Sequence, residues 1–139
     1  MKHAELIKRL TSLKQPSRGL DGEIGLLIGY TRSVRVEIHP ASQRQTSAAV
    51  WHTPANKETR LPFYTKLMND AYTFAQTALP EQSGGLSWDD AGGSARMGKG
   101  PYITAANAAI ALCIAVLGNM QQEEQEEDVE VEEVDIETD

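Results

Sequence analysis

The chain has 139 residues, 40% of them hydrophobic and 24% charged, which suits one globular domain with a real core and leaves no room for a second. Its formal net charge is −7, but eleven of the 20 acidic residues lie in residues 121–139, which contain no Lys or Arg. The remaining nine acids face 13 basic residues, so residues 1–120 carry a net charge of +4.

The cysteine content excludes a disulfide framework. Cys113 is the single cysteine and lies in an apolar run, which favours a reducing compartment. Residues 1–13, MKHAELIKRLTSL, alternate charged and apolar residues and lack the continuous apolar stretch of a signal peptide. We therefore expect a cytoplasmic protein that does not contact a membrane.

Two amphipathic helices are predicted near the N-terminus. In residues 4–13, and again in residues 20–29, apolar side chains recur every three or four positions, as on the buried face of a helix. They are Leu6, Ile7, Leu10 and Leu13 in the first segment and Leu20, Ile24, Leu27 and Ile28 in the second. Gly22 and Gly25 lower the helix propensity of the second segment, and we expect it to end near Gly29.

The pattern changes in the middle of the chain. Residues 34–39, VRVEIH, alternate apolar and polar side chains, as in a half-buried strand. Residues 47–52, SAAVWH, follow the polar turn PASQRQT and are expected to pair with them. The sequence predicts one antiparallel hairpin with one face toward the core.

A third helix is predicted in residues 64–79, YTKLMNDAYTFAQTAL. Its apolar residues form a stripe that we expect to be buried: Leu67, Met68, Ala71, Tyr72, Ala75 and Leu79. Thr65 is expected to cap the N-terminus of this helix, and Pro80 to end it.

Residues 84–100, GGLSWDDAGGSARMGKG, contain six glycines in seventeen positions. The turn residues favour a hairpin with LSW and ARM as strands around DDAGG, so Asp89 and Asp90 are expected in a turn and not as an acid–base pair. Gly93, Gly98 and Lys99 match most of a phosphate-binding loop, but Gly100 replaces the required Ser or Thr. A weaker alternative is an anion site, because Arg96 and Lys99 precede a helix and helix N-termini attract anions.

That last helix is predicted in residues 107–117, NAAIALCIAVL, with Asn107 as its N-cap. It is apolar on all sides and spans only about 15 Å, so we expect a core helix in which Cys113 is a packing residue. Gly118 and Asn119 are expected to end it.

The order of these segments resembles a family of small proteins of tailed bacteriophages and prophages, described as the phage alpha-beta-alpha sandwich domain. Tyr64 and Thr65 match a Tyr-Thr pair that opens a helix ending in Pro, and Asn107 and Ala108 stand where the family has Thr-Pro. The resemblance covers residues 5–29 and 61–117. It implies an α/β (α+β) fold, a small sandwich of about four helices around a short antiparallel sheet, and a phage origin. It implies no activity.

The chain is expected to divide into one α/β domain, residues 1–120, and an acidic tail, residues 121–139, which composition predicts to be disordered. If the tail has a function, it covers the basic body, attracts a basic partner, or adds a strand to a sheet edge. The last option follows from DVEVEEVDI, in which Val129, Val131, Val134 and Ile136 form a broken alternation.

The residues predict a binding protein and no enzyme. His3, His39 and His52 lack metal-ligand spacing, and no residues form a catalytic set or a cofactor site. Our first hypothesis is a non-enzymatic phage accessory protein, with counter-defence as one role, whose tail binds the basic surface of a host or phage protein. The tail residues expected at that contact are Glu123, Glu124, Glu126, Glu127 and Asp128.

Two other hypotheses stay open. In one, the protein sequesters a small phosphorylated or nucleotide-like anion, within one chain or between subunits of a homo-oligomer. The residues expected to bind that ligand are Arg96, Lys99, Trp51 and Tyr64. In the other, the basic body binds nucleic acid and the tail masks it, although Lys and Arg are scattered along the sequence.

Overall fold

The computed structural model describes the backbone of residues 1–137 and the side chains of residues 1–124. The described residues form four helices and six strands in two antiparallel sheets, β1-β2-β3 and β4-β5-β6, which confirms the predicted α+β class. In chain order the elements are α1 (His3–Thr11), α2 (Arg18–Leu27), β1 (Thr31–Ile38), β2 (Gln45–His52), β3 (Glu58–Thr59), α3 (Met68–Ala78), β4 (Gly84–Asp89), β5 (Gly92–Met97), β6 (Ile103–Ala105) and α4 (Ala108–Glu137).

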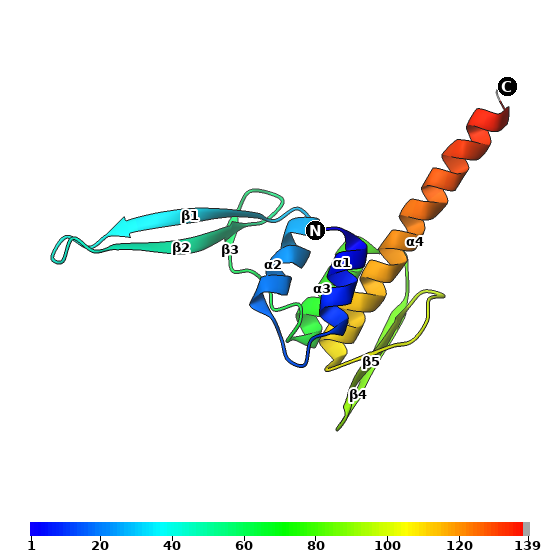
Figure 1. The fold of residues 1–139 in the computed structure, drawn as a ribbon, viewed down its shortest axis with the longest axis horizontal. Helices are drawn as coiled ribbons and strands as arrows, with labels where there is room; N and C mark the ends of the chain where they lie inside the picture. Colours follow the sequence, from blue (N-terminus) through cyan, green and yellow to red (C-terminus); the bar gives the residue numbers. More distant parts are fainter. Residues whose placement is uncertain (138–139) are drawn as a thin grey trace.

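Helix α4 forms the centre of the body (Figure 1). Every residue from Ala108 to Leu117 is buried, as expected for a helix that is apolar on all sides. α1 and α3 pack against it, and so does one face of the β4–β6 sheet. The predicted N-cap is confirmed, since the Ile110 N–H donates to Asn107 Oδ1 at 2.7 Å.

The predicted end of this helix at Gly118 and Asn119 is wrong. The helix continues through Asn119, whose side-chain amide donates to Met97 O at 2.7 Å and so connects α4 to the end of β5. One turn later, Glu123 Oε1 accepts a hydrogen bond from Gln82 Nε2, and Glu124 lies 3.8 Å from His3 Nδ1. The side chains of residues 125–139 lie outside the described part, so the division at residue 120 and the disorder of the tail stay predictions.

Both predicted N-terminal helices are present, and they show why α2 contains glycines. Leu6 and Leu10 of α1 are fully buried, and Gly29 ends the turn after α2 with a φ of 102°. A Cβ at Gly25 would come within 2.8 Å of Leu61. The glycine that lowers helix propensity therefore allows Leu61 to pack closely against α2.

The third helix begins later than predicted and shows a different face to the core. Thr65 is not its N-cap, because α3 starts at Met68 and Thr65 is buried in a polar network. Leu67, Met68 and Tyr72 are exposed, contrary to prediction. The core residues of this segment are Ala71, Phe74, Ala75 and Leu79. Adjacent helical positions differ by 100°, so Tyr72 turns to solvent when Ala71 faces α4.

The polar network centres on Asp21, whose carboxylate is fully buried. Its Oδ1 accepts hydrogen bonds from the N–H and hydroxyl of Thr65, both at 2.8 Å, and its Oδ2 accepts one from Arg18 Nη1 at 2.9 Å. The Thr65 hydroxyl also accepts from the Ser17 N–H, and the Thr65 carbonyl accepts from Asn107 Nδ2. The network therefore joins the start of α2, the segment before α3 and the cap of α4.

Replacing Asp21 should destabilise the fold strongly. Asp21→Ala leaves the buried Thr65 N–H without its acceptor, so we expect a loss of about 1–3 kcal/mol in the free energy of unfolding. Urea denaturation followed by circular dichroism measures this loss. Asp90→Ala, in an exposed turn, is the control and should change stability by less than about 0.5 kcal/mol. An Asp21→Ala variant as stable as this control would show that the network is dispensable.

Candidate functional site

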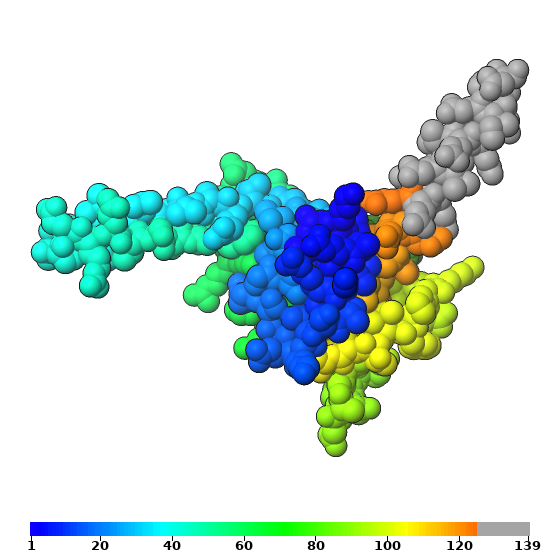
Figure 2. Space-filling model, viewed as in Figure 1, coloured from blue at the N-terminus to red at the C-terminus, as the bar shows by residue number. Residues whose placement is uncertain are grey.

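The predicted hairpin is present, but it is not half-buried. Strands β1 and β2 pair along their full length and project from the body as an arm, residues 31–52 (Figures 1 and 2). Val34, Val36 and Ile38 are 60%, 59% and 62% exposed, so the alternation in β1 does not mark a core-facing side. At eight residues per strand, the arm is about 27 Å long.

One face of the arm is covered only at its root. There Trp51 lies against α2, where a Cβ at Gly22 would be 3.4 Å from the indole ring. The register places Val34 opposite Ala49 and Val36 opposite Ser47 on the same face as Trp51. Beyond the reach of α2, this face carries an exposed apolar row that we call the arm stripe: Val34, Val36, Ile38 and Ala49.

The outer edge of β1 is also exposed, because β1 is the terminal strand of its sheet. The His39 N–H donates to Arg44 O, which continues the β1–β2 register and makes these two residues a hydrogen-bonded pair. Such pairs alternate along an antiparallel ladder, so odd-numbered residues of β1 direct their backbone groups toward β2. The even-numbered residues from Arg32 to Ile38 therefore direct theirs outward, away from β2.

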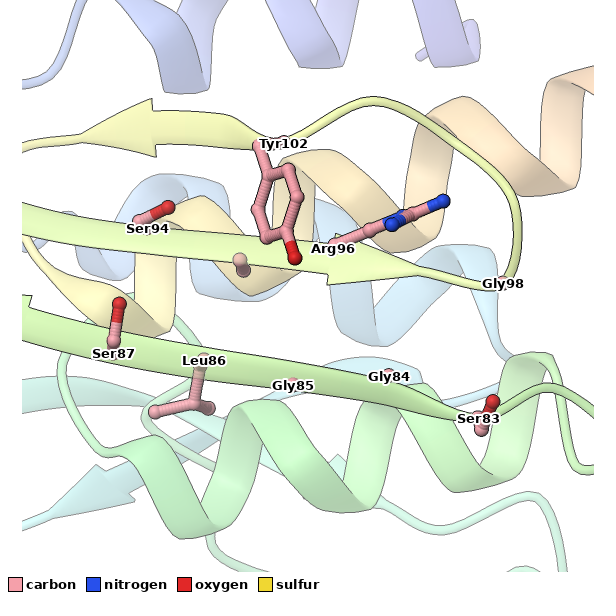
Figure 3. A pocket seen from close by; sticks show the side chains of 10 residues that line it. Ser83, Gly84, Gly85, Leu86, Ser87, Ser94, Arg96, Gly98 and Tyr102 are labelled. Carbon is pink, nitrogen blue, oxygen red and sulfur yellow. The ribbon is translucent and has the colours of Figure 1, made fainter.

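A second exposed surface lies on the β4–β6 sheet. Ala95 and Met97 face α4 and are buried, and the opposite face forms a shallow groove of about 510 Å³. Figure 3 shows Ser87 and Ser94 on this face, with the Tyr102 ring over β5. The Arg96 guanidinium lies 5.2 Å from the centre of that ring, and its Nε donates to Gly100 O at 2.9 Å. A positive charge beside an aromatic ring is thus held at one end of the groove.

The four residues predicted to bind a ligand do not come together. Arg96 lines the groove, whereas Trp51 lies at the root of the arm. Tyr64 is buried, with its ring centre 5.7 Å from that of Phe74, and burial raises the pKa of its phenol well above the usual range. Sequence reasoning missed Tyr102, which reaches Arg96 only through the pairing of β5 with β6.

Arg96 and Lys99 precede α4 in the sequence, as expected, but the loop that carries Lys99 lies far from the N-terminus of that helix. The glycines flanking Lys99 lie beside Asn119, since a Cβ at Gly100 would be 2.6 Å from Asn119 Oδ1. Asn119 is about 18 Å along α4 from its cap. Gly93 approaches the start of α4 instead, and a Cβ there would overlap the backbone of Asn107 and Ala108. The cause is β6, which carries the chain back along β5 before α4 begins.

The remaining candidates are structural. Asp89 Oδ1 accepts hydrogen bonds from the N–H groups of Ala91 and Gly92, so the predicted turn is confirmed. In the described part of the chain, no group of three His, Cys, Asp or Glu side chains is arranged to hold a metal ion. Of the predicted tail contacts, Glu123 and Glu124 touch the body, and the side chains of Glu126, Glu127 and Asp128 lie outside the described residues.

Comparison of the chain with protein-family models, curated proteins and solved structures gives no match. None of the helices in the part that the structure describes combines the length and apolar character needed to cross a bilayer.

Cys113 should be chemically inert in the folded protein. The thiol is fully buried, Sγ lies 3.4 Å from Tyr64 O, and burial, with a smaller contribution from Asp21, raises the pKa of the thiol. We expect Ellman's reagent at pH 8 to leave the native protein unmodified and to modify one thiol per chain in guanidinium chloride. Full reaction of the native protein would contradict the assignment of Cys113 to the core.

Proposed function

We propose that this protein is a non-enzymatic binding protein that acts through the arm. The observation that carries the proposal is the coincidence of the exposed arm stripe with the open edge of β1. Single exposed apolar side chains are common on protein surfaces, but an aligned row of them beside unpaired backbone groups favours strand addition by a partner.

The rest of the molecule suits this role. The arm is rooted on a body whose core residues belong to other elements, so it can contact a partner without disturbing that core. The hypothesis of a phage accessory protein that binds a host or phage protein is a setting in which such an arm would act. The acidic tail is a second, electrostatic element of the same proposal, with a salt-sensitive contribution to binding.

Shortening the arm tests the proposal. Residues 34–49 are replaced by Asn-Gly, which joins the paired residues Ser33 and Val50 by a two-residue turn and keeps Trp51 on α2. We expect a melting temperature within a few degrees of that of the full chain, because the removed residues are exposed. We also expect loss of the proteins that the full chain retains from a bacterial lysate, quantified by mass spectrometry.

Two further variants refine this experiment. Val34→Thr/Val36→Thr/Ile38→Thr keeps β-branched side chains and removes the apolar stripe, so it should behave like the shortened arm. Ala48→Thr, on the opposite face of the arm, is the matched control and should retain the partners. Partners that survive arm shortening, and are lost on removal of residues 125–139 or at moderate salt, would place the function in the tail instead.

We propose as a second candidate function the binding of a small phosphorylated molecule in the groove on the β4–β6 sheet. The favouring observation is the Arg96–Tyr102 pair beside the hydroxyls of Ser87 and Ser94. A guanidinium binds phosphate oxygens, and an exposed tyrosine ring stacks on a base. Lys99, which was also predicted to bind the ligand, is exposed after β5 and is not among the residues that line the groove.

Calorimetric titration with AMP, which carries both a phosphate and a base, tests this second function. Arg96→Gln should weaken AMP binding by about ten-fold, since it removes a charge-assisted hydrogen bond. Gly85→Val should also weaken it by filling the groove, because a Cβ at Gly85 meets open space among the described residues. Arg44→Gln, at the tip of the arm, is the control. Equal affinities for all four proteins would exclude this groove as the AMP site.

A further inference from the structure

The chemistry of the arm specifies its partner. We infer that the arm binds a second copy of this chain, through antiparallel pairing of β1 with β1 of that copy about a two-fold axis at Val36. The inference rests on the proposed function of the arm and adds the identity and register of the partner.

Backbone geometry first limits how two β1 strands can pair. Only the even-numbered residues direct their N–H and C=O groups to the outer edge, as the hydrogen bond from His39 to Arg44 establishes. Even-numbered residues of one copy must therefore face even-numbered residues of the other. A two-fold axis that passes through a residue of β1 meets this condition, and an axis between two residues does not.

Side chains then select one axis. With the axis at Val36, Val36 faces its own copy and Val34 faces Ile38 of the second copy, so apolar residues meet apolar residues. On the opposite face, Arg35 meets Glu37 of the second copy, twice over by symmetry. Opposite charges at directly facing positions stabilise an antiparallel pair.

The neighbouring registers lack this match. An axis at Arg35 places two arginines face to face, and an axis at Glu37 places two glutamates face to face, which is destabilising in both cases. An axis at Val34 sets Val36 against Arg32, and an axis at Ile38 sets Val36 against Pro40. The sequence of β1 is therefore self-complementary in one register only.

The present contacts of these residues leave them available. Arg35 Nη2 lies 3.2 Å from Glu58 Oε1, but both side chains are more than half exposed, so exchanging this partner has little effect on stability. Pro40 has no N–H and ends the paired stretch just beyond Ile38. Two copies joined in this way form a continuous sheet of six strands, with the two arm stripes side by side on one face.

Charge reversal tests the register on the full chain. Sedimentation equilibrium at low salt should show a reversible dimer for the native protein. Arg35→Glu and Glu37→Arg each create two facing like-charge pairs per dimer and should each raise the dissociation constant by about ten-fold or more. The double variant Arg35→Glu/Glu37→Arg restores opposite charges and should recover the native dissociation constant. Arg44→Glu, with the same charge change outside the paired stretch, is the control.

Crosslinking gives an independent measure of register. Under oxidising conditions Val36→Cys should form a disulfide-linked dimer faster than Arg35→Cys or Glu37→Cys, because only residue 36 faces its own copy. Cys113 is buried and should not contribute. Faster crosslinking at position 35 or 37 would overturn the proposed register.

The remaining outcomes separate this inference from the proposed function. A chain that stays monomeric at all concentrations, while arm shortening still removes its lysate partners, overturns the inference and leaves the proposed function in place. A dimer that withstands both single charge reversals also overturns it. A dimer that is lost only when residues 125–139 are removed would overturn the β1–β1 pairing and indicate that the arm binds the acidic tail of the second copy.

Discussion

The fold depends on one buried charge. The carboxylate of Asp21 has no access to solvent, so it is stable only where Thr65 and Arg18 supply its hydrogen bonds. Arg18 reaches further, donating to the carbonyls of Leu61 and Pro62 and lying 3.9 Å over the Phe63 ring. The chain leaves the body after α2 to form the arm and returns through these same residues. The network therefore holds α2 against residues 61–65, and α2 in turn supports the root of the arm through its contact with Trp51.

The apolar helix α4 explains why the exposed surfaces lie where they do. A helix that is apolar on all sides needs cover on all sides, and α1, α3 and one face of the β4–β6 sheet supply it. Because these elements pack on α4, α2 is the helix that covers the β1–β3 sheet, and it does so at the root of the arm. The distal arm and the outer face of the β4–β6 sheet remain exposed as a consequence. The groove is thus the outward side of a sheet whose inner side packs on α4, whereas the arm stripe is the continuation, beyond α2, of the face that Trp51 places against α2.

Local patterns in the sequence were sufficient to predict the helices, both hairpins and the Asn107 cap, because each depends on neighbours within a few residues. They were insufficient where a residue far away in the sequence determines the local structure.

Alternation in β1 shows that its two faces differ, but only the tertiary structure shows that no helix among the described residues extends over Val36. Thr65 has the side chain of a helix cap, yet its hydroxyl donates a hydrogen bond to Asp21, 44 positions away in the sequence. Gly118 is a residue type that commonly ends a helix, yet α4 continues through Asn119, whose side-chain amide donates to Met97 O. In the groove, Arg96 could be selected from the sequence as a candidate for anion binding, whereas its contact with Tyr102 depends on strand register.

An exposed strand edge invites uncontrolled pairing, and proteins usually block it with a proline, a bulge or inward-pointing charges. β1 pairs with β2 without interruption and has neither a proline nor a bulge between Thr31 and Ile38. Its charges instead make pairing selective, because shifting the register by two residues in either direction brings Arg35 or Glu37 against a like charge. Two-fold pairing also uses the β1 edge of both copies and leaves no β1 edge for a third, whereas pairing β1 with the edge of β2 would propagate from chain to chain. The same two side chains therefore select one register at this edge, which gives a physical reason for an Arg–Val–Glu sequence at the centre of β1.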